Sequence, residues 1–328
     1  MNQVERRTFL LTATALLVAP LAKAQQAKKI ARVGLLSMAP PERDRHWVAA
    51  LREGLRDLGY VEGQNLILEQ RHAPNDAAKA LELAADLVRS EVAVMLVYAS
   101  PTLPTLKKLF SNVPIVVLGH ADPVGSGIVA SLARPGGNIT GLTDGHMELA
   151  PKRLELLKEV VPTASRVSVL FNPLTSHALR QSKLLQAAGP RLGVTIVPIE
   201  IKAPQDIEQA FDTMHKQRVK ALVLAPDPSW ATDPRRIAEL AIRHRIPAIG
   251  SISELAEQGL LMAYGTNFAS LWRKSATYVD KILKGAKAAD LPVEFPTKFD
   301  LVLNLRTAKV LGVAIPQSIL LRTERVIE

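Results

Sequence analysis

The 328-residue chain contains no cysteine, which excludes structural disulfides, thiolate metal sites and a lipid anchor on a processed N-terminal cysteine. Aromatic residues make up only 4% of the sequence. No apolar run reaches the roughly 20 residues that a membrane-spanning helix needs. With 48% hydrophobic residues, the chain is long enough to bury two cores, and its composition predicts an ordinary globular protein.

The formal net charge of +10 is spread along the chain. A nucleic-acid-binding protein concentrates such charge in runs interleaved with aromatic residues. Here the longest basic clusters are pairs, such as Lys28-Lys29, Lys107-Lys108 and Arg235-Arg236. We therefore interpret the charge as solvated surface charge and expect no nucleic-acid partner.

Residues 1–24 have the pattern of an export signal. The paired Arg6-Arg7 precede an apolar run from Phe9 to Leu21, and Ala22-Lys23-Ala24 resembles a cleavage site. We expect cleavage after about Ala24 and a periplasmic mature protein with a formal charge of about +8, since this segment holds three basic residues against one acidic. The arginine pair favours twin-arginine export, with the general secretory route left open.

From Ile30 onward, short apolar strands alternate with amphipathic helices, a pattern that predicts parallel sheets with right-handed crossovers. The expected strands are 30–36, 66–69, 92–97, 115–118, 166–171, 194–199, 221–224, 248–249, 260–264 and 299–303. The expected helices are 47–58, 77–88, 103–110, 149–160, 177–189, 207–215, 237–244, 271–283 and 305–311, and residues 319–326 are expected to form a tail.

The stretch from Ile115 to Leu142 separates two successive sets of strands and helices. It begins as a strand, continues through a short helix-like segment and a Pro-Gly-Gly sequence at Pro135, and ends in a second short strand. Two similar α/β lobes fit this arrangement, and so does one large doubly wound sheet. We favour two Rossmann-like lobes with a cleft between them.

The sequence contains little evidence of catalytic or cofactor-binding motifs. Residues 125–130 match G-x-G-x-x-A, but a dinucleotide site needs its first glycine directly after a strand, and Asp122-Pro123-Val124 intervenes. There is no G-x-S-x-G, and the seven histidines lack the spacing of metal ligands. We expect no cofactor, no metal and no catalytic residue. His120 is the histidine that directly follows a predicted strand.

Polar side chains recur just beyond the predicted strand ends, where ligands bind in open α/β sheets. Hydroxyls near a helix start suit a carboxylate, and an aspartate suits an ammonium group. For each residue the alternative is a purely structural role, as a helix cap or in a turn. Their number, without a nucleophile and base, favours binding over catalysis. The candidates are Ser37, Ser100, Thr102, Asp122, Asn172 and Asp227.

Several segments resemble the exported substrate-binding proteins of ABC transporters, in the branch with tryptophan- and tyrosine-type receptors. The resemblance covers nearly the whole mature chain. It is carried by LGYVEGQN at 58–65, DPV at 122–124, SLARPGGNITG at 131–141, KRLELLK at 152–158, Asn172-Pro173, Tyr264-Gly265, YVDKILKG at 278–285 and LPVE through PTKF at 291–299.

The resemblance implies a type I periplasmic binding fold, with crossovers near residues 141–145, 264–266 and 291–294. Lobe 1 would comprise residues 28–143 and 266–292, and lobe 2 residues 144–265 and 293–328. It implies a monomeric receptor without enzymatic activity that delivers a small solute, such as an amino acid or similar zwitterion, to ABC permease membrane subunits. Tyr264 joins the predicted ligand contacts. A periplasmic sensor that serves a signalling partner is the alternative.

Overall fold

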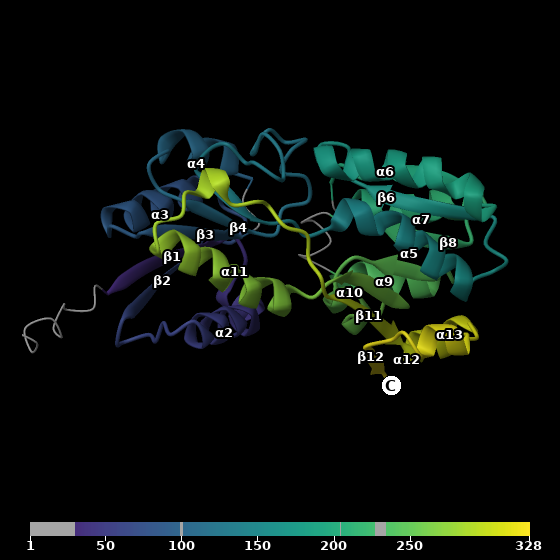
Figure 1. Cartoon of the computed structure of the whole chain (residues 1–328). Helices are drawn as coiled ribbons and strands as arrows, with labels where there is room; N and C mark the ends of the chain where they lie inside the picture. The colour runs from purple at the N-terminus through teal and green to yellow at the C-terminus, as the bar shows by residue number, and fades with distance from the viewer. Residues whose placement is uncertain (1–29, 99–100, 204, 227–233) are drawn as a thin grey trace, which may run out of the picture.

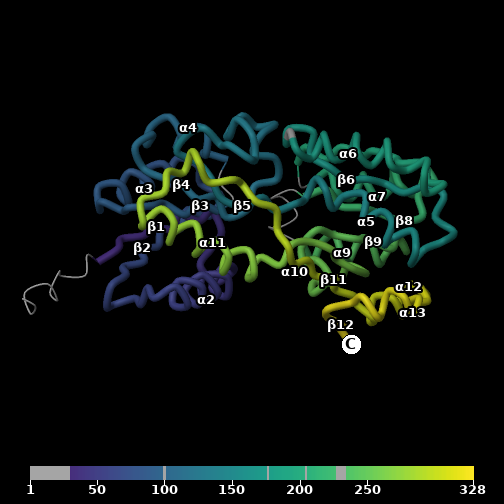
Figure 2. Tube along the Cα trace, in the orientation of Figure 1, coloured from purple at the N-terminus to yellow at the C-terminus, as the bar shows by residue number. Residues whose placement is uncertain are grey.

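The computed structural model describes residues 30–98, 101–203, 205–226 and 234–328, and the predicted signal peptide lies outside these ranges. Figure 1 shows two α/β lobes side by side, each built on its own sheet, as the strand pattern predicted. Figure 2 shows the Cα trace passing from one lobe to the other and returning.

The sheet of lobe 1 is entirely parallel, with the strand order β2-β1-β3-β4-β5. Its strands are β1 (Ala31–Ser37), β2 (Leu66–His72), β3 (Val94–Tyr98), β4 (Ile115–Leu118) and β5 (Ile139–Leu142). Its helices are α2 (Pro41–Asp57), α3 (Ala77–Arg89), α4 (Leu103–Leu109) and α11 (Phe268–Leu283), which returns from the far end of the chain.

The sheet of lobe 2 has the strand order β12-β11-β10-β9-β8-β6-β7. Its strands are β6 (Arg166–Phe171), β7 (Thr195–Glu200), β8 (Ala221–Leu224), β9 (Ala248–Gly250), β10 (Met262–Thr266), β11 (Phe299–Asn304) and β12 (Arg325–Ile327). Its helices are α5 (His146–Val160), α6 (Ser176–Ala188), α7 (Asp206–Lys216), α9 (Pro234–Arg243), α10 (Ser253–Glu257), α12 (Leu305–Leu311) and α13 (Gln317–Leu320). The 3₁₀ turn η2 (Gly189–Leu192) belongs to this lobe, and η3 (Ala288–Asp290) lies beside β5 of lobe 1.

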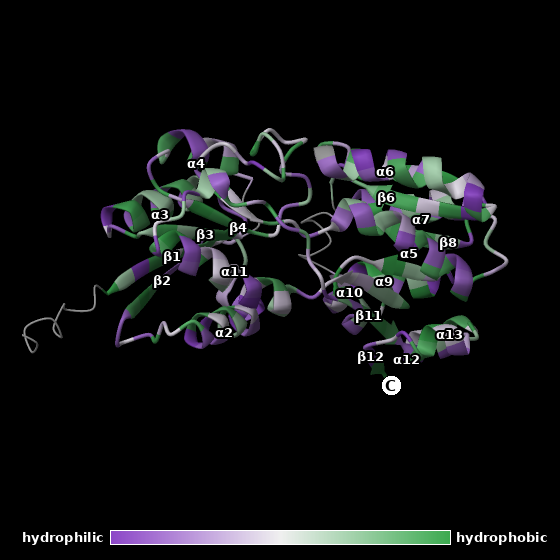
Figure 3. Ribbon diagram, viewed as in Figure 1, coloured by the Kyte–Doolittle hydropathy of each residue, from purple (hydrophilic) through white to green (hydrophobic). Residues whose placement is uncertain are grey.

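Apolar clusters cover both faces of each sheet, which explains the continuous runs of aliphatic residues in the strands. Figure 3 shows hydrophobic strands between helices that carry both polar and apolar residues. In lobe 1, α11 approaches α2 at Gly54, where an added Cβ would lie 2.4 Å from the carbonyl oxygen of Arg273. The Arg273 guanidinium also pairs with Glu53 and Asp57 of α2.

The structure corrects four expectations about the elements. The helix-like segment after β4 is a series of turns, without a helix between residues 119 and 138. The expected tail forms α13 and β12, and α10 was not predicted. The second sheet is not purely parallel, because β10 and β11 run antiparallel. The chain leaves lobe 2 at the end of β10 and re-enters it through the third crossover at the start of β11, so these neighbouring strands run in opposite directions. Apolar alternation in a sequence does not indicate strand direction.

The three crossovers lie against one another. The amide of Thr143 donates to the carbonyl oxygen of Glu294 at 2.9 Å, which joins the first crossover to the third. The hydroxyl of Thr266 donates to the carbonyl oxygen of Asp144 at 2.6 Å, and the amide of Asn267 donates to that of Lys298 at 3.0 Å. These bonds connect all three passages into one hinge-like segment between the lobes.

Candidate functional site

Two of the predicted hydroxyl residues of lobe 1, Ser37 and Thr102, lie at or just beyond the carboxyl ends of its strands. Ser37 ends β1 and is fully buried, and its Oγ accepts the amide of Ala39 at 3.1 Å. Thr102 directly precedes α4 and is also buried. Ser100 lies outside the described residues. The Ser37 oxygen therefore shapes the loop after β1, in addition to any contact that it makes with a ligand.

Asp122 connects the two lobes. Its Oδ1 accepts the amide of Gly125 at 2.7 Å, and its carboxylate forms an ion pair with Arg180 of α6. The G-x-G-x-x-A pattern thus begins a turn whose first glycine amide binds the protein's own carboxylate. The pattern therefore does not form the strand-to-helix turn that a dinucleotide site requires.

His120 supports the same loop. Its Nδ1 accepts the amide of Asp122 at 3.0 Å, so the imidazole proton resides on Nε2. Burial lowers the pKa of His120, and the neighbouring carboxylates of Asp144 and Asp122 oppose that shift. We infer that His120 holds the Asp122 loop as a neutral ring at neutral pH.

The predicted residues of lobe 2 are more dispersed. Asn172 follows β6, and its Oδ1 accepts the amide of Leu174 at 3.0 Å in a turn that leads into α6. This turn places α6, and hence Arg180, opposite Asp122. Asp227 lies outside the described residues.

Tyr264 lies apart from the other predicted contacts. With residues of α5, β11 and the third crossover, its side chain lines a hollow of about 400 Å³ in lobe 2. The described residues around this hollow include none of the other predicted site residues. The hollow's lining is Lys152, Leu156, Tyr264, Thr297, Lys298, Phe299, Leu301, Arg322 and Glu324.

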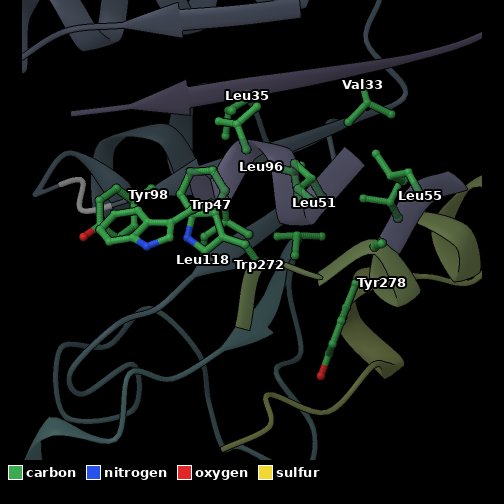
Figure 4. Packing of buried hydrophobic residues seen from close by; sticks show 14 of the residues in the cluster. Val33, Leu35, Trp47, Leu51, Leu55, Leu96, Tyr98, Leu118, Trp272 and Tyr278 are labelled. Carbon is green, nitrogen blue, oxygen red and sulfur yellow. The ribbon is translucent and has the colours of Figure 1, made fainter. Parts of the chain in front are cut away.

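An aromatic group that the sequence analysis did not assign to the site lies where β3 ends. It consists of Trp47, Tyr98, Phe268 and Trp272. The Trp47 ring centroid is 5.0 Å from that of Phe268 and 5.3 Å from that of Tyr98. Figure 4 shows the Tyr98 oxygen pointing away from the aliphatic core of lobe 1. Burial raises the pKa of this phenol, so it remains protonated and can donate a hydrogen bond.

Phe268 is the member of this aromatic group that faces lobe 2. Its ring centroid is 6.5 Å from that of His146, the first residue of α5. Phe268 also approaches Gly119, where an added Cβ would lie 3.3 Å from the phenyl ring. The residues between the lobes therefore combine aromatic rings, the Asp122–Arg180 ion pair and the first turn of α5; we call this the interlobe region.

A buried polar network supports the interlobe region from lobe 2. The Arg153 guanidinium is fully buried, and its Nε donates to the carbonyl oxygen of Tyr264 at 2.8 Å. Its Nη2 is 3.3 Å from Nδ1 of His146, and Gln181 donates to the carbonyl oxygen of His146 at 3.1 Å. Arg153 therefore joins the start of α5 to β10, at the first and second crossovers.

The protonation state of His146 follows from this contact. Because a guanidinium has no acceptor, Nδ1 of His146 must accept, and the ring proton resides on Nε2. Nε2 lies 3.8 Å from Oδ2 of Asp144. Burial, with a smaller contribution from Arg153, lowers the pKa of His146 to about 4, and burial lowers that of Arg153 to about 10. The network therefore carries one positive charge at neutral pH.

Sequence reasoning did not identify Arg153, although its position carried a signal. Arg153 is four residues from both Leu149 and Leu157, so it lies on the apolar stripe of α5, where a charged side chain must find buried partners. The aromatic group left no such signal, because Trp47 fits the apolar stripe of α2 equally well as a core residue.

Two further features bear on the class of protein. Within the described ranges, no helix combines the length and the apolar character that crossing a membrane requires. The same ranges contain no cluster of three or more histidine or acidic side chains with a geometry that suits a metal ion.

Comparisons with known proteins place the chain in a family. A family model described as ABC transporter substrate binding protein matches residues 41–327. A tyrosine-binding protein from Clostridioides difficile (strain R20291) is 24% identical over 290 residues, which cover 88% of this chain and 83% of that protein.

Solved structures share the fold of this chain. A conserved domain protein from Vibrio cholerae is 27% identical with a TM-score of 0.81, over 91% of this chain and 100% of its own. A domain from Streptococcus pneumonia in complex with L-Trp is 24% identical with a TM-score of 0.81, over 90% and 99%. The predicted type I periplasmic binding fold is thus confirmed, as is the expectation of a binding protein rather than an enzyme. The chain belongs to the family of ABC transporter substrate-binding proteins.

Proposed function

We propose that this protein is a periplasmic receptor that binds an aromatic amino acid in the interlobe region and delivers it to the permease subunits of an ABC importer. The observation that carries this proposal is the placement of Tyr98 and Phe268, whose rings lie 5.9 Å apart where the lobes meet. A relative named for tyrosine binding and a similar structure in complex with L-Trp support the same ligand class.

Polar residues at the strand ends would bind the main-chain groups of the ligand. The hydroxyls of Ser37, Ser100 and Thr102 suit its carboxylate, and Asn172 and Asp227 would approach from lobe 2. Closure of the predicted lobes, 28–143 with 266–292 and 144–265 with 293–328, would let both sides contact one ligand. The crossover hydrogen bonds supply a hinge for this motion.

Export and delivery complete the proposed role. The signal-like residues 1–24 support secretion of the mature chain, and membership of the family supports delivery to a permease. We expect the mature receptor to act as a monomer, because each chain holds both lobes.

Calorimetric titration of the mature chain with the twenty common amino acids tests this function. We expect L-tyrosine or L-tryptophan to bind more tightly than any aliphatic amino acid. Phe268→Leu should weaken aromatic binding by about 10-fold, the scale of one ring contact. Phe211→Leu, the same substitution in the buried core of lobe 2 and outside the aromatic group, is the matched control and should leave affinity unchanged. Preference for an aliphatic or non-amino-acid ligand would overturn the proposal.

A further inference from the structure

Among the residues that the structure describes, Asp122 and Asp144 border the interlobe region, and of these two Asp144 has no lysine or arginine partner. We propose that Asp144, rather than Asp122, accepts the ammonium group of the amino acid, and that Asp122 serves the contact between the lobes. This inference rests on the proposed function. It names a specificity-determining residue that the strand-end pattern did not indicate.

The Asp122 carboxylate is already satisfied by the protein. Oδ1 accepts the Gly125 amide at 2.7 Å, and the Arg180 guanidinium supplies a full positive charge from lobe 2. A ligand ammonium at this position would have to displace Arg180 and leave that guanidinium without its counter-charge. Displacement of a charged partner costs much of what the new pair gains.

The Asp144 carboxylate has no such partner. Its Oδ1 accepts the His146 amide at 3.0 Å, as a cap on α5. Its Oδ2 lies 3.8 Å from Nε2 of His146, beyond hydrogen-bond distance. Among the residues that the structure describes, no lysine or arginine nitrogen lies within 4.0 Å of this carboxylate. A nearly buried anion with one oxygen uncommitted is a strong acceptor for an ammonium group.

The surroundings of Asp144 match an aromatic amino acid. Its Cβ lies 3.5 Å from the point where Gly119 would carry a side chain, and the Phe268 ring lies 3.3 Å from that same point. Gly119 has φ +99, a conformation that favours glycine, and its missing side chain leaves Cβ of Asp144 and the Phe268 ring on either side of one open point. An aromatic amino acid carries its ammonium group a few bonds from its ring. Asp144 would bind the ammonium group, and Phe268 would contact the ring.

The polar network of Arg153 and His146 lies behind Asp144. Arg153 donates toward Nδ1 of His146, which fixes the neutral ring with its proton directed toward Asp144. The buried guanidinium lies on the far side of the His146 ring and forms no direct ion pair with the carboxylate. The start of α5 thus presents the Asp144 carboxylate, while the Arg153 cation stays behind the ring.

A comparison of two ligands that differ in the amine isolates this role. Calorimetry of the mature chain would use L-tyrosine and L-tryptophan against 3-(4-hydroxyphenyl)propionate and indole-3-propionate, which lack the ammonium group. We expect the wild type to prefer the amino acids by at least about 100-fold, the scale of an unpaired buried charge. Asp144→Asn, which keeps the capping oxygen, should reduce that preference to less than about 5-fold.

Two variants complete the test. Glu155→Gln, an acid on α5 beyond the first turn with a 47% exposed side chain, is the matched control and should retain both affinities. Asp122→Asn should weaken both ligand types alike and retain the preference. If Asp144→Asn does not fold, Asp144→Ser offers another capping side chain without charge. An unchanged preference in the Asp144 variants, or its loss in Asp122→Asn, would overturn the inference alone. Failure of the wild type to bind any amino acid would overturn the proposed function with it.

Discussion

The carboxylate of Asp122 in lobe 1 is paired with the guanidinium of Arg180 in lobe 2. Asp122 lies in the loop after β4, and Arg180 lies on α6, so the pair joins a loop of lobe 1 to a helix of lobe 2. Side-chain exposures of 23% and 38% place it at the rim of the interlobe region. It is therefore a direct contact that lobe opening must break.

Removing this ion pair should favour the open form. A double-mutant cycle with Arg180→Gln and Asp122→Asn should give a coupling energy of about 0.5–1 kcal/mol for lobe closure. The value is small because solvent partly screens a partly exposed ion pair. Small-angle scattering of the unliganded variants should give a larger radius of gyration than the wild type, and 1 M salt should abolish the difference. Identical scattering curves for the variants and the wild type would contradict a role in closure.

Arg153 should be among the residues most important for stability. Arg153→Met leaves the carbonyl oxygen of Tyr264 without its buried donor and removes one of the two side-chain donors to that of His146, so we expect a loss of about 3 kcal/mol in unfolding free energy. Lys152→Met, the neighbouring residue with a 45% exposed side chain, should cost less than about 0.5 kcal/mol. Urea denaturation measures both. Equal stabilities would mean that the buried guanidinium contributes nothing to the hinge.

Stability should depend on pH through His146. Its pKa falls from the usual 6.5 to about 4 in the folded state, so the unfolded chain binds more protons between these values. The neutral ring therefore contributes stability above pH 6.5, of order 3 kcal/mol, which is lost as the pH falls toward 4.

Chemical denaturation at pH 7 and pH 4.5 tests the contribution of His146. His146→Asn keeps an acceptor for Arg153 and cannot titrate, so its stability should fall less across this range than that of the wild type. His215→Gln, an exposed histidine on α7, should match the wild type at both values. A steep wild-type dependence that persists in His146→Asn would assign the effect to other groups.

Two glycines with positive φ allow the stability cost of backbone strain to be measured separately from the cost of close packing. Gly141 in β5 has φ +132, and an added Cβ would lie 2.4 Å from the carbonyl oxygen of Val117. Gly127 has φ +71 and no atom within 4 Å of an added Cβ. We expect Gly127→Ala to cost about 1 kcal/mol and Gly141→Ala at least about 3 kcal/mol, since the second must also separate β4 from β5. Thermal melts that shift equally would contradict the close approach of these strands.

Much of the fold was predictable, because apolar runs and helical stripes record burial directly. Strands such as β4 and β8 lie at the residues where the β-branched and aliphatic runs placed them. The antiparallel pairing of β11 and the short β12 left no such record. Strand direction and edge pairing depend on where the chain returns, which no local pattern encodes.

The site was less predictable than the fold. Strand-end reasoning selected Ser37, Thr102 and Asp122, which lie at or beyond the carboxyl ends of lobe 1 strands, and their contact with a ligand stays a prediction. It could not reveal that Arg180, which is 58 positions away in the sequence, neutralises Asp122. The strand-end pattern did not select Asp144, which follows a short edge strand at a crossover, and its proposed role depends on Phe268, which is brought there by a helix from a distant part of the chain.

A crystal structure of the mature protein with L-tyrosine or L-tryptophan tests the central claim most directly. We predict ligand density between the lobes, with the ring against Tyr98 and Phe268 and the ammonium nitrogen about 2.8 Å from the Asp144 carboxylate. The Asp122–Arg180 pair should remain intact in that complex. Density in the hollow beside Tyr264, or a ligand whose ammonium group contacts Asp122 in place of Arg180, would contradict the account.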